Sequence, residues 1–200
     1  VNSTFINNRA NDSGWSGPGG SFGIGSVSSL TIENVTTIGG SGLNDVNISG
    51  GTNVTMINST ISGKLVTGDR AADDPGRPYL QNTIVGSVTG TFNSGGGNII
   101  TANSTDNGFV NGVNGDRVAV DPLLGPIQNN GGFVPTRLPG IGSPAIDGGV
   151  VSVVSSDARG VSRPADGGAG SPLFDIGAVE FQDATVTGTV FHDLNGNGLL

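Results

Sequence analysis

Apolar and polar residues alternate in short runs through the first half of the chain. In LTIENVTTI (30–38) Leu30 and Ile32 are separated by a threonine, and in VTMINSTI (54–61) Val54 and Met56 are separated in the same way. A period of two places successive side chains on opposite faces of a strand, whereas a helix repeats about every 3.6 residues. Together with the many β-branched residues, the pattern predicts short β-strands rather than helical repeats.

The strands predicted in this way belong to a repeat. Four stretches share an aliphatic-rich run, an asparagine, one or more threonines and another large apolar residue: VNSTFINNRA (1–10), LTIENVTTIGG (30–40), VTMINSTISGK (54–64) and LQNTIVGSV (80–88). When they are aligned on Asn2, Asn34, Asn58 and Asn82, the successive spacings are 32, 24 and 24. Self-similarity at this period indicates a solenoid. A coil of this length fits one rung of a parallel β-helix, so we expect an all-β fold of that kind.

The aligned asparagines are expected to form the turns between strands. Stacked on one another, their amides would form a ladder in which each hydrogen-bonds to the next. The alternative is that they form turns without such contacts. The sequence Asn58-Ser59-Thr60 also matches an acceptor for N-glycosylation, but in this repeat the three residues are more simply read as part of a turn.

Composition agrees with many short strands joined by turns. The chain has 37 glycines, 34% hydrophobic residues, 12% charged residues and 5% aromatic residues. Its formal charge of −8 disfavours nucleic acids and anionic membrane surfaces as partners, because both need clustered Lys and Arg. The absence of cysteine excludes disulfides and thiolate metal sites. No run approaches the about 20 apolar residues of a membrane span.

One insertion between repeats is unusually rich in charge for this chain. The segment VTGDRAADDPGRPY (66–79) contains Asp69, Arg70, Asp73, Asp74 and Arg77. Insertions in solenoids often collect on a binding face, which makes this segment the best candidate for a functional loop. If the chain were an enzyme, these would be its catalytic candidates. The simpler interpretation is a solvated loop with internal ion pairs.

The repeat weakens after residue 89, and the organisation changes. We expect β-helix coils over residues 1–108 and an irregular segment over 109–182. A solenoid needs a cover, because its last coil exposes apolar side chains and unpaired strand edges. We therefore expect 109–182 to act as a cap.

Four motifs within the cap resemble a known family. VDPLLGPIQNNGG (120–132), LPGIGSPAIDGG (138–149), DARGVSRP (157–164) and FDIGAVEF (174–181) are similar to the closing segment of the right-handed β-helix surface proteins of bacteria labelled choice-of-anchor Q, which are related to polymorphic outer-membrane-type passengers. The resemblance covers roughly residues 20–182. It implies a pectin-lyase-like fold and secretion or surface display, without implying an enzymatic activity.

The last residues resemble a different module. ATVTGTVFHDLNGNGLL (184–200) is similar to the first strand and loop of an SdrD B-like or Cna B-type domain, an immunoglobulin-like sandwich, so we assign residues 183–200 to its truncated start. The resemblance implies calcium ligands at Asp193, Asn195, Asn197 and the Leu199 carbonyl. An acidic twelfth position would fall beyond Leu200. We therefore expect calcium in the complete parent protein and an incomplete loop here.

Charged residues also gather within the cap motifs. Arg159 and Arg163 lie near Asp157, Asp175 and Glu180 in a region with little other charge. Guanidinium groups pair well with carboxylates, so we expect ion pairs that pin the cap to the last coil. The alternative is a pair of glycosidase carboxylates.

Three functions remain open at this point. The first is a non-catalytic structural or adhesive segment of a large modular bacterial protein, located outside the cell or on its surface, with its signal and anchor outside this chain. The second is a polysaccharide lyase or glycoside hydrolase, and the third is a carbohydrate-binding module. Partners would be neighbouring domains, extracellular polysaccharide or another cell surface. His192 is the only histidine, which argues against Ser-His-Asp chemistry.

Overall fold

The computed structural model describes residues 3–6, 22–25, 28–38, 44–49, 53–71, 73–103, 107–167 and 170–182. The described residues form an all-β structure and contain no helix. The strands are β1 (Ser3–Ile6), β2 (Phe22–Ile24), β3 (Ser29–Glu33), β4 (Val35–Ile38), β5 (Asn44–Ile48), β6 (Asn53–Ile57), β7 (Thr60–Thr67), β8 (Tyr79–Gln81), β9 (Ile84–Thr89), β10 (Asn93–Ser94), β11 (Ile99–Ile100) and β12 (Arg117–Val118).

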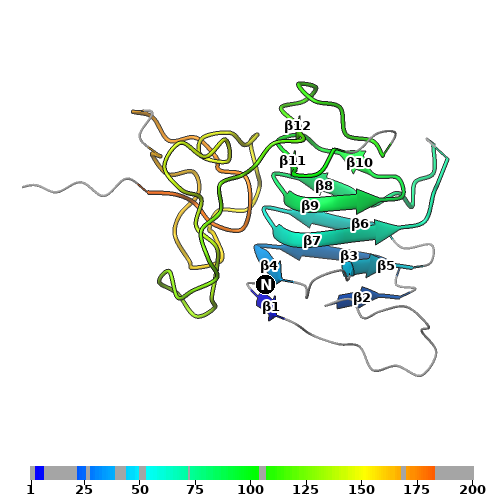
Figure 1. The fold of residues 1–200 in the computed structure, drawn as a ribbon, viewed down its shortest axis with the longest axis horizontal. Helices are drawn as coiled ribbons and strands as arrows, with labels where there is room; N and C mark the ends of the chain where they lie inside the picture. Colours follow the sequence, from blue (N-terminus) through cyan, green and yellow to red (C-terminus); the bar gives the residue numbers. More distant parts are fainter. Residues whose placement is uncertain are drawn as a thin grey trace, which may run out of the picture.

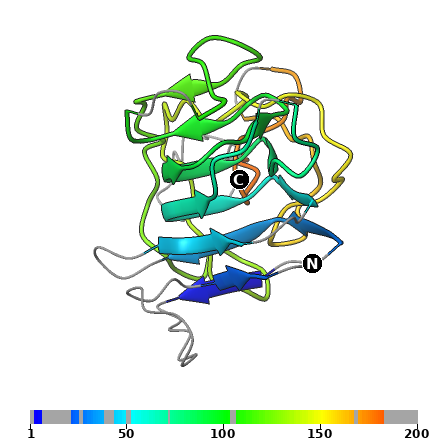
Figure 2. The same cartoon turned by 90° about the vertical axis from the view of Figure 1, so that its right-hand side faces the viewer.

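The strands form two sheets in which every pairing is parallel. The larger sheet has the order β1-β4-β7-β9-β11-β12, with β2 and β5 attached beside this path, and the smaller sheet has the order β10-β8-β6-β3. The chain alternates between them, from β3 to β4, from β6 to β7, from β8 to β9 and from β10 to β11. Figures 1 and 2 show the strands stacked from β1 and β2 at one end to β12 at the other.

The register of the sheets reproduces the spacing predicted from the repeats. Ser3 pairs with Val35 at an interval of 32, and Thr36, Thr60 and Ile84 follow one another at intervals of 24. The smaller sheet has the same shorter interval, since Ser29 pairs with Asn53. Beyond β9 the interval contracts to 15, and Ile84 pairs with Ile99. The weakening of the repeat in the sequence is therefore a shortening of its period.

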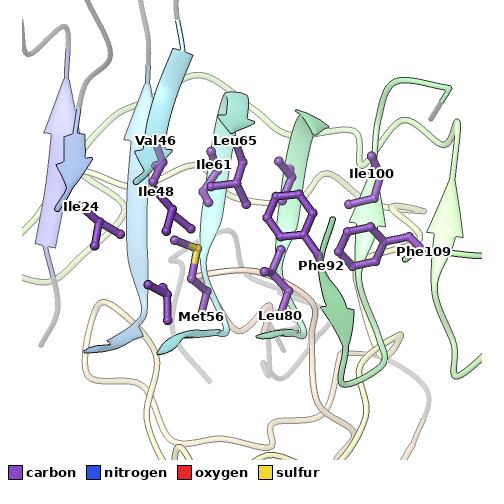
Figure 3. Close-up of a cluster of buried hydrophobic side chains, with 12 residues drawn as sticks. Ile24, Val46, Ile48, Met56, Ile61, Leu65, Leu80, Phe92, Ile100 and Phe109 are labelled. Atoms are coloured by element: carbon purple, nitrogen blue, oxygen red, sulfur yellow. The ribbon is translucent and has the colours of Figure 1, made fainter. Parts of the chain in front are cut away.

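A continuous row of apolar side chains lies between the two sheets (Figure 3). The row is supplied by strands of both sheets and by two phenylalanines of the connecting segments, and it comprises Ile24, Val46, Ile48, Val54, Met56, Ile61, Leu65, Leu80, Val85, Phe92, Ile100 and Phe109. The rings of Phe92 and Phe109 end the row in a tilted contact with centroids 5.8 Å apart. Burial of such a side chain stabilises a fold by about 1.5–3 kcal/mol, so this row is the main source of stability for the sheets.

Three of the four corners at which the chain passes from the smaller to the larger sheet are made by an asparagine in the left-handed backbone region, whereas the corner between β10 and β11 has Gly96 and Gly97 at positive φ. Asn34, Asn58 and Asn82 have φ angles of 54°, 48° and 48°. Asparagine tolerates this region better than most residues with a β-carbon, which explains why it recurs at the corner. The prediction that the aligned asparagines form turns is confirmed for these three, while Asn2 lies outside the described residues.

The corner amides, however, do not form the expected ladder. The Asn82 amide donates to the Val150 carbonyl at 2.7 Å and accepts from the Val150 N–H at 2.8 Å. Asn58 donates to the Ser152 hydroxyl at 3.0 Å, and Asn34 donates to the Ser156 carbonyl at 2.8 Å. Residues 150–156, which we call the strap, thus cross three successive corners. The strap competes for the same amide groups, so the asparagines bond to it instead of to each other.

The irregular segment lies beside the sheets (Figure 1). It packs on the larger sheet through a second apolar cluster, in which Ala145 and Ile176 meet Ile84 of β9 and Ile99 of β11. The Ala178 N–H donates to the Thr60 hydroxyl at 3.0 Å. We expected this segment to cover the last coil, but these contacts place much of it along the flank, because it satisfies the corner amides of several repeats.

The corner geometry gives a stability prediction. Replacement of Asn82 by glycine keeps the left-handed backbone but removes two side-chain hydrogen bonds to Val150, which we expect to lower the unfolding free energy by about 2 kcal/mol. Replacement by alanine adds the strain of a β-carbon, about 1 kcal/mol more. Urea denaturation measures both effects. Asn114→Gly is the matched control: Asn114 has a φ of 52° but is exposed, so its replacement should change stability by less than about 0.5 kcal/mol. Equal effects at Asn82 and Asn114 would contradict the role of the strap.

Candidate functional site

The charged residues of the irregular segment come together in one buried cluster, which we call the carboxylate cluster: Asp157, Arg159, Arg163, Asp175 and Glu180. Its three carboxylates have no exposed surface, and Arg163 is only 6% exposed. Turns of the irregular segment bring the five residues together. The Arg163 backbone bonds to the Ser155 carbonyl, and the Asp157 backbone bonds to the Val161 carbonyl.

Asp157 holds a turn closed and also reaches the end of the segment. One of its oxygens accepts the N–H groups of Arg159 and Val161 at 2.7 and 3.0 Å. The other accepts the Arg159 guanidinium at 2.8–2.9 Å and the Glu180 N–H at 2.9 Å. Asp157 therefore couples the turn at 157–161 to Glu180.

The Arg163–Glu180 ion pair lies at the centre of the cluster. Their closest atoms are 2.5 Å apart, and neither side chain has exposed surface. Arg163 also donates to the carbonyls of Asp175 and Gly177, and Glu180 also accepts the N–H groups of Ala165 and Asp175. Loss of one partner from such a pair leaves an uncompensated buried charge, which typically costs about 3–5 kcal/mol.

Asp175 has backbone partners on both carboxylate oxygens. It accepts the Asp147 N–H at 2.7 Å and the Phe181 N–H. Burial raises the pKa of Asp175 to about 7, against the opposing effect of these two donors. Burial likewise raises the pKa of Glu180 and lowers that of Arg163, in each case against the attraction of its partner.

This arrangement is suited to holding the segment together. All six carboxylate oxygens of Asp157, Asp175 and Glu180 accept hydrogen bonds from the protein. A glycosidase pair needs carboxylates that reach the sugar and an attacking water, so these buried groups do not have the required access. The two ion pairs join residues of the irregular segment to each other, and contacts with the sheets are made by other groups. The prediction that ion pairs join the cap to the last coil is wrong for these two pairs, because both partners of each pair lie in the irregular segment.

The charged insertion between β7 and β8 contains a smaller ion pair. Arg70 lies 3.3 Å from Asp74, whose other oxygen accepts the Gly76 N–H at 2.7 Å. This backbone bond is the main cause of the lowered pKa of Asp74, and Arg70 adds to it. The side chains of Asp69 and Asp73 are exposed, and Arg77 is partly buried.

A groove that the sequence did not indicate lies on the outer face of the larger sheet. Its volume is about 310 Å³, and it is lined by Ile61, Ser62, Ile84, Gly86, Thr101, Asp121, Pro122, Leu124 and Arg137. Arg137 is a single arginine in a Pro/Gly-rich stretch without a recognisable motif. Only its contacts across the fold reveal it, so the sequence had no local signal for this site.

The predicted calcium ligands Asp193, Asn195, Asn197 and Leu199 lie outside the described residues. Within the described part of the chain, no group of three or more His, Cys, Asp or Glu residues is arranged to hold a metal ion. The same residues include no helix that is long and apolar enough to cross a membrane.

Comparison with protein-family models, curated protein sequences and solved structures finds no match to this chain. The class of protein that the observations define directly is therefore an all-β protein with two parallel sheets and an irregular C-terminal segment beside them.

The buried carboxylates give a pH prediction. A raised carboxyl pKa means that the folded state holds the proton more tightly than the unfolded state between the ordinary value of 3.8 and about 7. Stability should therefore rise as pH falls through 7. Acidification from about pH 8 to about pH 5.5 should add about 2 kcal/mol to the unfolding free energy for a shift of this size.

Denaturant unfolding at several pH values measures this gain. Asp175→Asn should lose most of it, since the titrating group is removed. Asp73→Asn, a change at an exposed loop residue, should retain it. A stability that stays constant or falls over the same range would show that Asp175 remains ionised in the folded protein.

Proposed function

We propose that this chain is a non-catalytic structural or adhesive segment of a large modular bacterial protein that acts outside the cell or on its surface. Its fold would be a right-handed parallel β-helix of the pectin-lyase-like kind, continued by a B-type module. The resemblance of residues 120–181 to choice-of-anchor Q proteins supports the family and the location. Neighbouring domains of the same chain, together with polysaccharide or another cell surface, would be its partners, and calcium would belong to the module that follows.

The observation that carries the proposal is the repeating register shared by both sheets. Thr36–Thr60–Ile84 in the larger sheet and Ser29–Asn53 in the smaller sheet advance by the same interval, and an asparagine turns the chain at three successive corners. A chain that passes from one sheet to the other and returns one strand further on builds length by adding equal units. Such a structure is suited to a rigid spacer.

The contacts of the charged groups support a structural role over catalysis. In the carboxylate cluster two arginines pair with Asp157 and Glu180 within the fold, and in the 66–79 insertion Asp74 is held by Arg70 and Gly76. A polysaccharide-active enzyme needs acids that converge on a substrate. In the insertion, Asp69 and Asp73 are exposed to solvent, while Asp74 is held by the loop itself.

Tandem duplication of one repeat tests the proposed solenoid. A second copy of residues 29–52 adds one full register interval beside the end of the stack and leaves the strap contacts of Asn34 to Asn82 in place. We expect cooperative unfolding with a urea m-value raised by about a tenth, because m follows the surface buried on folding. Duplication of residues 41–52, half of that length, should disrupt the register and broaden or abolish the transition. If both insertions behave alike, the repeats do not stack as a solenoid.

Incubation with polysaccharides tests the non-catalytic role. With pectin or alginate and calcium present, we expect retention on the polymer or no interaction, and no release of new chain ends. Release of unsaturated or reducing ends by the intact chain would contradict the proposal, and its loss in Asp73→Ala or Asp74→Ala would assign the activity to the 66–79 insertion. Asn114→Ala serves as the control for preparation effects.

A further inference from the structure

The groove on the larger sheet is formed where a hairpin lies over the strands. Leu124 bridges to Pro139 and Gln128 to Thr136 in antiparallel fashion, and the resulting hairpin contributes Leu124 and Arg137 to the groove. The sheet contributes Ser62 of β7 and Gly86 of β9, followed by Thr101 after β11. The groove thus spans three neighbouring strands and combines an apolar floor with hydroxyl and charged groups.

Arg137 is fixed in the groove by neutral partners alone. Its Nε donates to the Gly125 carbonyl at 2.7 Å, one terminal nitrogen donates to the Leu124 carbonyl at 3.0 Å, and the other donates to the Ser62 hydroxyl at 3.2 Å. A guanidinium carries five N–H groups, so one on each terminal nitrogen is left without an acceptor among the residues that the structure describes. Among the described residues, Arg137 has no carboxylate within ion-pair distance, unlike Arg70, Arg159 and Arg163.

This guanidinium is also partly withdrawn from water. Burial lowers the pKa of Arg137, and the charge of Asp121 acts in the opposite direction. A positive charge that is held in place, partly desolvated and not directly paired is a suitable site for an anionic group. The carbonyl and hydroxyl contacts fix the orientation of the Arg137 guanidinium, as hydrogen bonds from neighbouring groups do for a residue that binds a ligand.

Asp121 gives the groove a second, opposite charge. It lines the same space, is exposed, and uses one oxygen to accept the Leu123 N–H at 2.9 Å. Among the described residues, no ion pair joins Asp121 to Arg137, so each of the two charged groups can contact a ligand. The whole chain carries a charge of −8, which disfavours a net anion, whereas a ligand with both charges is not repelled.

We propose that this groove binds a small zwitterion, an α-amino acid or a short peptide, with its carboxylate on Arg137 and its ammonium group on Asp121. A volume of about 310 Å³ is at the lower end of the range for ligand sites, which suits a molecule of this size. Ser62 and Thr101 supply hydroxyls for the polar atoms between the two charged ends. Ile84 and Leu124 supply the apolar lining for the remainder of the ligand.

NMR titration with glycylglycine tests the site. We expect saturable binding with Kd on the order of 1 mM, as for a ligand of this size with two charged contacts. N-acetylglycine retains only the carboxylate and glycinamide only the ammonium group, and each should bind about ten-fold more weakly. Comparison with glycine distinguishes the two sources: equal or tighter binding of glycine identifies a free amino acid, and tighter binding of glycylglycine identifies a peptide.

Variants of the groove residues decide whether this is the site. Arg137→Gln and Asp121→Asn should each weaken glycylglycine binding about ten-fold. Because Arg137 also anchors the hairpin, Thr101→Trp provides a second test: Thr101 is exposed, and the larger side chain should fill the groove while both charges remain. Arg70→Gln, which removes an ion pair elsewhere, should leave binding unchanged.

The proposal is overturned by any of three results. The first is no saturable binding of glycylglycine or glycine at concentrations up to about 20 mM. The second is binding of N-acetylglycine as strong as that of glycylglycine, which would remove the role of Asp121. The third is unchanged binding in folded Thr101→Trp, which would place the ligand elsewhere.

Discussion

The structure depends on one backbone requirement that recurs at three successive corners between the two sheets. Asn34, Asn58 and Asn82 must all enter the left-handed region so that the chain leaves the smaller sheet and joins the larger one in the same direction. Only then do the strands of successive repeats pair in register and place their alternate side chains in one apolar row. The corner also turns the amide of each asparagine outward, where the strap can bind it.

The strap and the carboxylate cluster both provide hydrogen-bond partners for the backbone of the irregular segment, the strap from the sheets and the cluster from within the segment. The segment has almost no regular strands, so its backbone groups need partners other than a ladder. The strap finds them at the corner amides, and the cluster supplies carboxylates that accept backbone N–H groups of residues 147, 159, 161, 165, 175, 180 and 181. Buried charge is thus used here to fix an irregular chain path, at the cost of desolvating carboxylates.

The strands and their register could be predicted because they follow from local pattern. Alternation around residues 30–38 and 54–61, together with the spacing of the asparagines, is visible in the sequence without knowledge of any distant contact. The partners of the corner amides could not be predicted, since the strap has no complementary motif and stacked turns offer an equally good use for an amide. The charged residues of the cluster were identified by type, but their closure within one segment needed the turns at 157–161 and 175–180.

The groove was missed for a similar reason. Arg137 bonds to Ser62 across 75 residues of sequence, and its other two partners are backbone carbonyls, which carry no sequence signal. The charged insertion at 66–79 is conspicuous in composition, yet Asp69 and Asp73 are exposed and Asp74 is held by its own loop. Charge density along the chain is therefore a poor guide to where charges gather in a fold whose contacts are mostly between distant residues.

The strap also imposes an order on assembly. Its three contacts close loops of very unequal length: Asn82 is 68 residues from Val150, Asn58 is 94 from Ser152 and Asn34 is 122 from Ser156. These loops are nested, and the shortest one has the smallest entropy of closure. Once Asn82 is engaged, the next corner is one strand spacing away and the longer loops are already largely closed. The C-terminal segment thus fastens the sheets in the reverse of the order in which the chain is synthesised, and the earliest corner is the last to be secured.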